Sequence, residues 1–170
     1  MSANPQPAAE NGGGELGLYA AQLQQALDKL CERVEGLSSA QLNWKPPAPE
    51  ANSIYVIATH TLGNAESWVL GIACGQPIER DRPAEFRAAG ESARPIVEKA
   101  RELGTRIDAA LRALPEGTLG ETRQAPPYLW GAGEARTVTV REALMHVVHH
   151  AANHLGHIDV TRDLAITVAV

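Results

Sequence analysis

Apolar residues recur every three or four positions in four separate stretches of this 170-residue chain. Such a period marks one face of an amphipathic helix, and in a small protein that face must be buried against a neighbour. The stretches span about residues 15–37, 54–72, 92–114 and 140–163. Prolines and glycines separate them, and the alternating patterns typical of strands are almost absent. The sequence therefore predicts an all-α fold in which four helices form a bundle.

Polar residues and one glycine give more detail on these helices. Asn52 or Ser53 can cap the second helix, and Thr139 with Glu142 forms a capping-box pattern at the start of the fourth. Gly104 lies inside the third predicted helix, where glycine lowers helix stability by about 1 kcal/mol relative to alanine. We therefore expect Gly104 to mark a close contact between helices.

The N-terminal segment differs in kind from the rest of the chain. Residues 1–14 contain two prolines and a run of three glycines, and they show no apolar period. This composition predicts a disordered tail followed by a single domain over residues 15–170.

Two connecting segments stand out between the predicted helices. Residues 79–90 are highly charged with both signs mixed, and we expect a solvated loop with a short turn. Residues 115–138 lack a helical period, although the chain around 136–140 could be extended. Loops this long are often functional. Tyr128 and Trp130 in this loop could close over a site or pin the loop to the bundle.

Composition excludes several classes of function. A net charge of −5 and an isoelectric point near 5.7 argue against a nucleic-acid-binding protein, which usually carries a basic face. No apolar run approaches the ~20 residues that a membrane span needs, and the start of the chain does not resemble a secretory signal. Cys31 and Cys74 do not make a disulfide framework, and we expect buried, unreactive thiols. A cytoplasmic location is the simplest expectation.

Five of the six histidines lie between residues 146 and 157, inside the fourth predicted helix. A helix turns by about 100° per residue, so these side chains can be placed around its axis. One ridge at the edge of the apolar stripe is formed by His146, His150, His154 and His157. His149 points away from this ridge and should face solvent.

Two members of the ridge have a spacing that suits a metal ion. His150 and His154 are four residues apart, so their Cβ atoms lie about 6 Å apart and both rings can reach one ion. Ordinary polar residues at the edge of a core would show the same spacing. His60 in the second predicted helix lies beside a buried stripe. Alone, it would be interpreted as a core-edge histidine, but with the pair it completes a site of three histidines. Such a site leaves a coordination position open, as in catalytic metal sites.

Several segments together resemble the DinB-like superfamily of metal-binding four-helix proteins, over about residues 15–165. They are LNWKP at 42–46, NSI at 52–54, His60 with Gly63, RDRPAEF at 80–86, and the pattern H-x3-H-x3-H-x-G-H-I from His146 to Ile158. The resemblance implies a bundle with an up-down-down-up course, and often a homodimer. It also implies a divalent metal ion, commonly zinc or nickel, held by His60, His150 and His154.

One position departs from the family pattern. A glutamine commonly follows the glycine after the last ligand, whereas this chain has His157. His157 and His146 therefore add alternative nitrogen ligands close to the predicted site.

The resemblance also limits the possible activities. Characterised relatives include thiol transferases that use bacillithiol or mycothiol, and the mycothiol-dependent maleylpyruvate isomerase. It therefore implies a metal-dependent enzyme, a thiol S-transferase or a hydrolase, that acts on a small molecule such as a low-molecular-weight thiol. The alternative is a non-catalytic, metal-stabilised stress-related or interaction protein.

Overall fold

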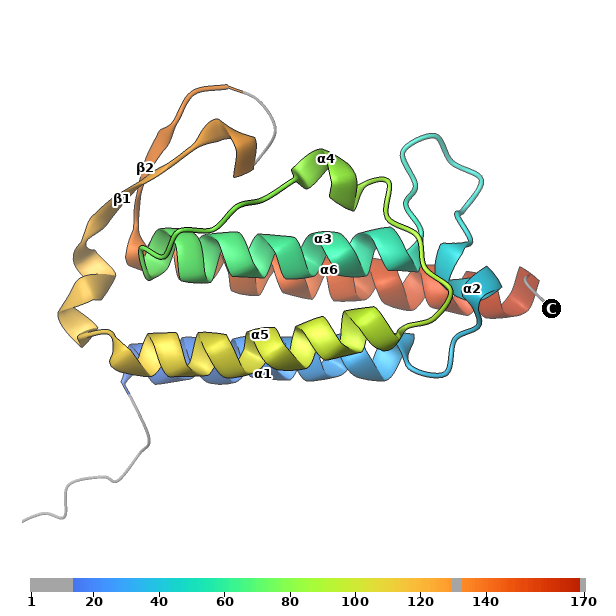
Figure 1. The fold of residues 1–170 in the computed structure, drawn as a ribbon, viewed down its shortest axis with the longest axis horizontal. Coiled ribbons are helices and arrows are strands. Elements are labelled where there is room, and N and C mark those ends of the chain that lie inside the picture. Colours follow the sequence, from blue (N-terminus) through green and yellow to red (C-terminus); the bar gives the residue numbers. More distant parts are fainter. Residues whose placement is uncertain (1–13, 130–132, 169–170) are drawn as a thin grey trace, which may run out of the picture.

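A computed structural model describes residues 14–129 and 133–168 of the chain. Most of the predicted N-terminal tail, and Trp130, lie outside the described residues. Four long helices form the bundle (Figure 1). They are α1 (Glu15–Val34), α3 (Ile54–Ala65), α5 (Arg94–Ala113) and α6 (Val140–Val168), with α3 continuing into a π-helical segment, Glu66–Ala73. The predicted all-α four-helix bundle is therefore confirmed.

The course of the chain explains why the second and third long helices are parallel. In Figure 1, α1 and α6 run in one direction, and α3 and α5 run in the other. After the π-helical segment the chain crosses back along the outside of α3, through the short helix α4 (Arg82–Glu85), before it enters α5. This crossover produces the up-down-down-up course that the family resemblance implies.

The helix ends follow local chemistry. The Ser53 hydroxyl accepts a hydrogen bond from the Val56 amide, as expected for an N-cap. At the start of α6 the Thr139 amide donates to the Glu142 carboxylate at 2.7 Å, and the Glu142 amide donates to the Thr139 hydroxyl at 3.1 Å, which confirms the capping box. Gly36, with a φ of +80°, follows the end of α1 and stops it slightly before the predicted boundary.

The long loop before α6 is more ordered than expected. It contains an antiparallel hairpin of β1 (Thr122–Ala125) and β2 (Arg136–Thr139), with Thr122 opposite Thr139. The prediction of an extended segment near residue 136 is thus confirmed, but the expectation that the rest of the loop has no regular structure was wrong. Each strand has four residues, which is too short for an alternating pattern to stand out in the sequence. Another short helix, α2 (Ser39–Asn43), was also missed and begins with a capping box at Ser38.

The core runs along the bundle axis and consists mainly of aliphatic side chains. Its largest fully buried members include Leu23, Leu30, Leu103, Ile107, Leu144 and Ile158. A Cβ atom on Gly104 would lie 2.5 Å from the Gln24 side chain of α1, which confirms the close helix contact predicted there. No described helix is both long and apolar enough to cross a membrane.

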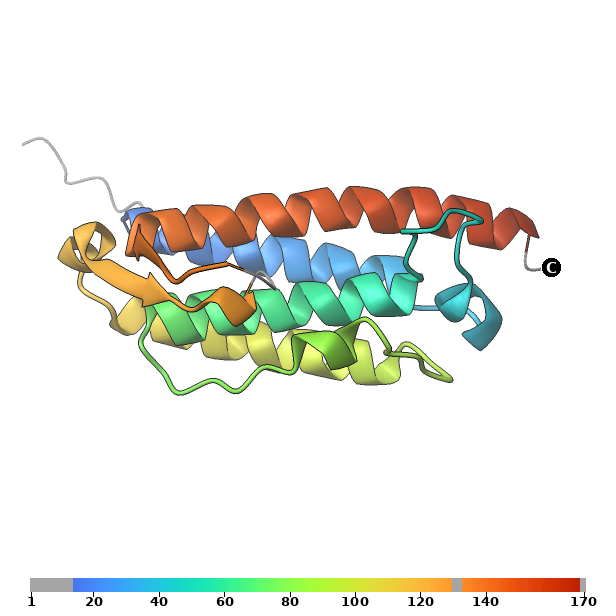
Figure 2. The same ribbon diagram turned by 90° about the horizontal axis from the view of Figure 1, so that it is seen from above.

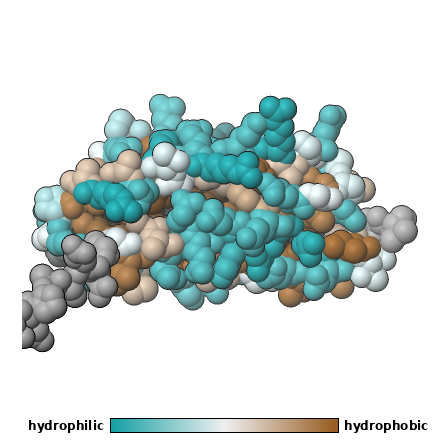
Figure 3. Space-filling model, turned by 90° about the horizontal axis from the view of Figure 1, so that it is seen from below, coloured by the Kyte–Doolittle hydropathy of each residue, from teal (hydrophilic) through white to brown (hydrophobic). Residues whose placement is uncertain are grey.

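The two sides of the bundle differ in what covers them. Seen from above, the hairpin and the crossover with α4 both lie over the side formed by α3 and α6 (Figure 2). The opposite view shows mainly hydrophilic side chains in its middle part, with apolar ones toward its ends (Figure 3). The α3–α6 side therefore has two added segments that can shape a site.

Candidate metal centre

Three histidine rings meet between α3 and α6. His60 comes from α3, and His150 and His154 come from successive turns of α6. The Nε2 atom of His150 lies 3.2 Å from Nε2 of His60 and 3.1 Å from Nε2 of His154. One nitrogen from each ring lies within 4.8 Å of the other two. The structure thus brings together the three histidines that the sequence analysis singled out.

The donor set fits a divalent cation. His60 Nδ1 lies 2.7 Å from a Glu85 carboxylate oxygen, which can only accept, so Nδ1 carries the proton and Nε2 presents a lone pair. In a tetrahedral zinc site with bonds of 2.0–2.1 Å, neighbouring nitrogens lie roughly 3.3 Å apart. The observed separations are close to this spacing. Three histidine nitrogens at this spacing form a donor set of the kind found in catalytic zinc sites.

The environment keeps the two α6 imidazoles neutral, as ligation requires. Burial, followed by the neighbouring imidazoles of His154 and His60, lowers the pKa of His150 to about 2. Burial, followed by His60 and His157, lowers the pKa of His154 to about 4. Both rings therefore hold lone pairs at neutral pH without a metal ion being present.

A carboxylate and a guanidinium on the crossover hold His60 in place. The Glu85 carboxylate accepts from Arg80 Nε at 2.6 Å and from Arg80 Nη2 at 2.8 Å, besides its bond with His60. The Arg80 side chain is only 3% exposed. The expectation of a solvated loop was therefore wrong for Arg80, because its charge is neutralised inside the protein by Glu85. Such carboxylate–histidine pairs commonly orient metal ligands.

The pKa of Glu85 reflects the same contacts. Burial by itself raises this pKa, but the hydrogen bonds from His60 and Arg80 outweigh burial and hold the pKa below its usual value. Glu85 is therefore ionised at neutral pH and accepts the proton on His60 Nδ1. The sequence analysis missed Glu85 and Arg80 as site residues. Both lie in the RDRPAEF segment at 80–86, but no periodicity there shows which charges turn inward.

A glycine makes room for this carboxylate on the surface of α3. A Cβ atom on Gly63 would collide with the Glu85 carboxyl group and lie 2.9 Å from its Cδ. Gly63 follows His60 by almost one helical turn, so the two residues share one face of α3. The absence of a side chain at residue 63 lets the crossover approach His60 closely.

The remaining histidines of α6 do not join the group. His146 Nε2 lies 3.4 Å from the Asn64 side-chain nitrogen, and its ring is 4.3 Å from that of Trp68, centroid to centroid. His157 is exposed, with its ring centroid 5.5 Å from that of His154. His149 is exposed, as predicted. The ridge is therefore present, but only its two middle members face His60.

The sequence of this chain also matches a known protein family. The sequence model of the DinB superfamily matches residues 22–158. The chain belongs to the DinB superfamily. No protein with curated information gives a significant match.

Solved structures support the same fold for this DinB-superfamily chain. A DinB-like protein from Bacillus cereus is 20% identical with a TM-score of 0.60, and the match covers 86% of this chain and 85% of that one. YfiT from Bacillus subtilis, described as a probable metal-dependent hydrolase with an unusual four-helix bundle topology, is 18% identical with a TM-score of 0.66, covering 94% and 91%. A conserved protein from Enterococcus faecalis is 18% identical with a TM-score of 0.67, covering 92% and 99%.

A small cavity opens beside the histidine group of this DinB-superfamily protein. This histidine-side cavity has a volume of about 220 Å³. The described residues that line it are His60, Asn64, Trp68, Arg82, Leu129, Arg136, His146 and His150. They come from α3, the π-helical segment, α4, the long loop and α6. The cavity gives a small molecule access to the side of the site that the protein does not fill.

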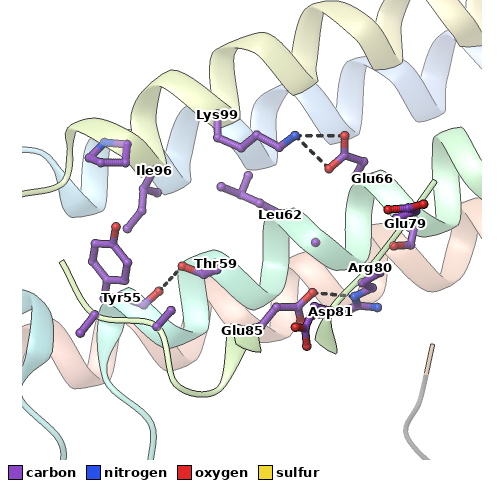
Figure 4. Close-up of a pocket in the computed structure, with 15 residues that line it drawn as sticks. Tyr55, Thr59, Leu62, Glu66, Glu79, Arg80, Asp81, Glu85, Ile96 and Lys99 are labelled. Carbon is purple, nitrogen blue, oxygen red and sulfur yellow. Dashed lines mark hydrogen bonds and ion pairs between the residues drawn. The ribbon is translucent and has the colours of Figure 1, made fainter. Parts of the chain in front are cut away.

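A larger cavity, of about 480 Å³, lies between α3, α5 and the crossover (Figure 4). We refer to it as the Glu66-side cavity. Glu66 in its wall accepts from Lys99 at 2.9 Å and from Arg106 at 2.6 Å. The Arg80–Glu85 ion pair also lines this cavity, and the same Glu85 carboxylate binds His60. No histidine is among the described residues that line it.

Other residues considered from the sequence lie outside the histidine group. Tyr128 is 51% exposed and borders a different depression with Gly71 and Pro77, so it does not cover the histidines. Cys31 is buried and Cys74 is half-buried, and burial raises the pKa of both thiols, that of Cys74 to about 11. Neither cysteine is an activated nucleophile.

Proposed function

We propose that this DinB-superfamily protein is a metal-dependent hydrolase of a small molecule. Its divalent cation, zinc or nickel, would be held by His60, His150 and His154. The observation that carries the proposal is the meeting of three imidazole Nε2 atoms beside a cavity. Three protein ligands leave a coordination position for water or substrate. The description of YfiT, a protein of similar fold, as a probable metal-dependent hydrolase supports the same class of reaction.

The chemistry of such a site divides between the ion and the protein. A bound divalent cation supplies Lewis-acid chemistry and lowers the pKa of a water or thiol to near neutrality. Glu85 accepts the Nδ1 proton of His60, which fixes the tautomer and makes Nε2 the ligand atom. Arg80 holds Glu85 in turn. Trp68 and Leu129 give the histidine-side cavity apolar walls that restrict bulk water.

The test begins with the metal content of protein purified without a histidine tag. We expect about one divalent ion per chain, because the three histidines form one site. The loaded protein should hydrolyse members of a panel of small esters and amides, and removal of the ion by a chelator should abolish that activity. Activity that survives complete chelation would contradict the proposal.

A thiol S-transferase is the second candidate, because the family resemblance includes such enzymes and a cation activates a thiol as it does a water. The same protein should be assayed with a low-molecular-weight thiol and a carbon electrophile. Turnover that depends on the thiol assigns the transferase class. A large fall in melting temperature on chelation, without turnover of any substrate, would instead favour the non-catalytic alternative. The homodimer remains a prediction, which light scattering can check.

A further inference from the structure

We propose that the histidine-side cavity recognises a substrate through an oxyanion, a carboxylate or a phosphate, and that the Arg82 guanidinium binds it. The inference rests on the proposed function for the reaction itself, because it names the substrate class of that same site. The binding of the oxyanion can be measured independently of turnover.

Arg82 forms no ion pair with a carboxylate in the part of the chain that the structure describes. The side chain is half-buried, and its Nε is buried without a hydrogen-bond partner among the described residues. Its Cζ lies 4.8 Å from the centre of the Phe86 ring, which itself stacks at 4.9 Å against the His60 ring. The ring contact holds the guanidinium beside the cavity and leaves its Nε without a hydrogen-bond partner among the described residues. A buried donor without a partner is costly, so a ligand that satisfies it gains affinity.

Other arginines of the described chain show the contrast. Eight of them form an ion pair with a carboxylate, namely Arg33, Arg80, Arg94, Arg101, Arg106, Arg112, Arg123 and Arg141. Most of these pairs lie on the surface, where water could solvate the charge in any case. Among the described residues, Arg82 and Arg162 each have a buried Nε without a partner, and of these two only Arg82 lines the histidine-side cavity, which marks it as a position for an incoming anion.

The cavity wall as a whole favours negative charge. Arg82 and Arg136 both line it, and no Asp or Glu is among its described lining residues. The chain nevertheless carries a net charge of −5, so this concentration of positive charge is local. A cationic, partly enclosed cleft attracts anions. The planar guanidinium fork matches the oxygens of a carboxylate or a phosphate.

The dimensions and walls limit what the anion is attached to. A volume of about 220 Å³ excludes large ligands. Trp68 and Leu129 contribute apolar surface to the wall that Arg82 and the histidines also line. The substrate class is therefore a small molecule with an oxyanion at one end, a short apolar part, and its reactive bond at the other end.

Calorimetric titration tests this assignment on metal-free and metal-loaded protein. The probes are benzoate, phenyl phosphate and the neutral benzamide. We expect at least one anion to bind about tenfold or more tightly than benzamide, since charge-assisted hydrogen bonds are the stronger ones. The preferred anion distinguishes a carboxylate from a phosphate. Arg82→Gln should lower that affinity by about tenfold, and Arg82→Lys by less, because it retains the charge but not the fork.

Controls separate anion binding from other effects. Arg87→Gln, at an exposed arginine on the same crossover, should leave affinity unchanged. Metal content and circular dichroism should match wild type in every variant. If Arg82→Gln does not fold, Arg82→Met keeps a flexible side chain over Phe86 and replaces it in the test.

The outcomes distinguish this proposal from the hydrolase. Equal binding of benzamide and the anions, or unchanged anion affinity in Arg82→Gln, overturns the oxyanion site even if the protein hydrolyses neutral esters. Arg82-dependent anion binding in a protein that hydrolyses nothing supports the site and contradicts the hydrolase. If both hold, Arg82→Gln should raise KM for an anionic ester by about tenfold and leave KM for its neutral analogue unchanged.

Discussion

The Glu66-side cavity and the histidine-side cavity differ in chemistry as well as in volume. In the Glu66-side cavity, Glu66 is neutralised by two basic partners, although Ser67 Oγ lacks a partner. Around the histidine group, several buried polar atoms have no partner among the described residues: Asn64 Oδ1, His150 Nδ1, His154 Nδ1 and Arg82 Nε. Unsatisfied buried polar groups need an explanation, and a ligand in the histidine-side cavity supplies one for Asn64 and Arg82, which line it. The smaller cavity is therefore the better functional candidate, and volume alone would have favoured the other.

The largest expected effect is the loss of the metal ion on removing the central imidazole. His150→Ala should reduce binding from about one ion per chain to a trace, because His150 Nε2 lies next to both other ligand atoms. His157→Ala, on the exposed end of the ridge, is the matched control and should bind normally. Elemental analysis measures both variants. Normal metal content in His150→Ala would mean that the ion binds elsewhere.

The next effect compares the buried Glu85 with the half-buried Glu66. Glu85→Gln should weaken metal affinity by about 10–100-fold, because His60 loses the carboxylate that orients it. Glu66→Gln should leave metal affinity unchanged and lower the free energy of unfolding by about 1 kcal/mol, because it breaks partly exposed ion pairs. Competition with a chromophoric chelator gives the affinities. Equal weakening by both substitutions would show that the two cavities are not functionally distinct.

Gly63 tests how tightly the crossover is packed against the site, and Gly104, between α1 and α5, is the comparison. Gly63→Ala should lower the free energy of unfolding by about 1–3 kcal/mol, because the new methyl group displaces a carboxyl held by Arg80 and His60. Gly104→Ala meets only the end of the flexible Gln24 side chain and should be neutral or stabilising by up to about 1 kcal/mol. Urea unfolding distinguishes them. A stable Gly63→Ala protein with normal metal affinity would contradict the close approach.

The last expected effect is a gradual dependence of stability on pH in the metal-free protein. The folded pKa values of His150 and His154, about 2 and about 4, lie below the usual 6.5, so the unfolded chain binds more protons. Stability should therefore fall as pH drops from about 6.5 toward 4. Glu66 and Glu85 have lowered pKa values, so their contribution is present above about 4.5 and is lost only as pH falls through the lower folded values. The melting temperature of the wild type should fall more steeply from about pH 6.5 to 4 than that of His150→Ala, which lacks one of the two histidines. An identical slope in both proteins would contradict the histidine contribution.

Much of this arrangement was predictable because its signals are local. The helical period, the Ser53 cap, the Thr139–Glu142 capping box and the four-residue spacing of His150 and His154 all depend on residues within a few turns of one another. His60 was also predicted, from its place beside the buried stripe of the second helix, and the structure places its ring against the other two. The short strands β1 and β2 and the helix α2 were missed because elements of four or five residues carry little periodic signal.

The sequence by itself determined that four amphipathic helices would bury their apolar faces together and that two imidazoles on the last one would share a face. Only the tertiary structure decided which charges of the crossover turn inward. Arg80 and Glu85 are buried against His60, whereas Arg82 faces the histidine-side cavity, although all three lie within six residues. The reason is physical: a charge is buried only where a partner or a ligand compensates it. Glu85 compensates Arg80 within the crossover, but the His60 ring that Glu85 also binds comes from α3, which is distant in sequence.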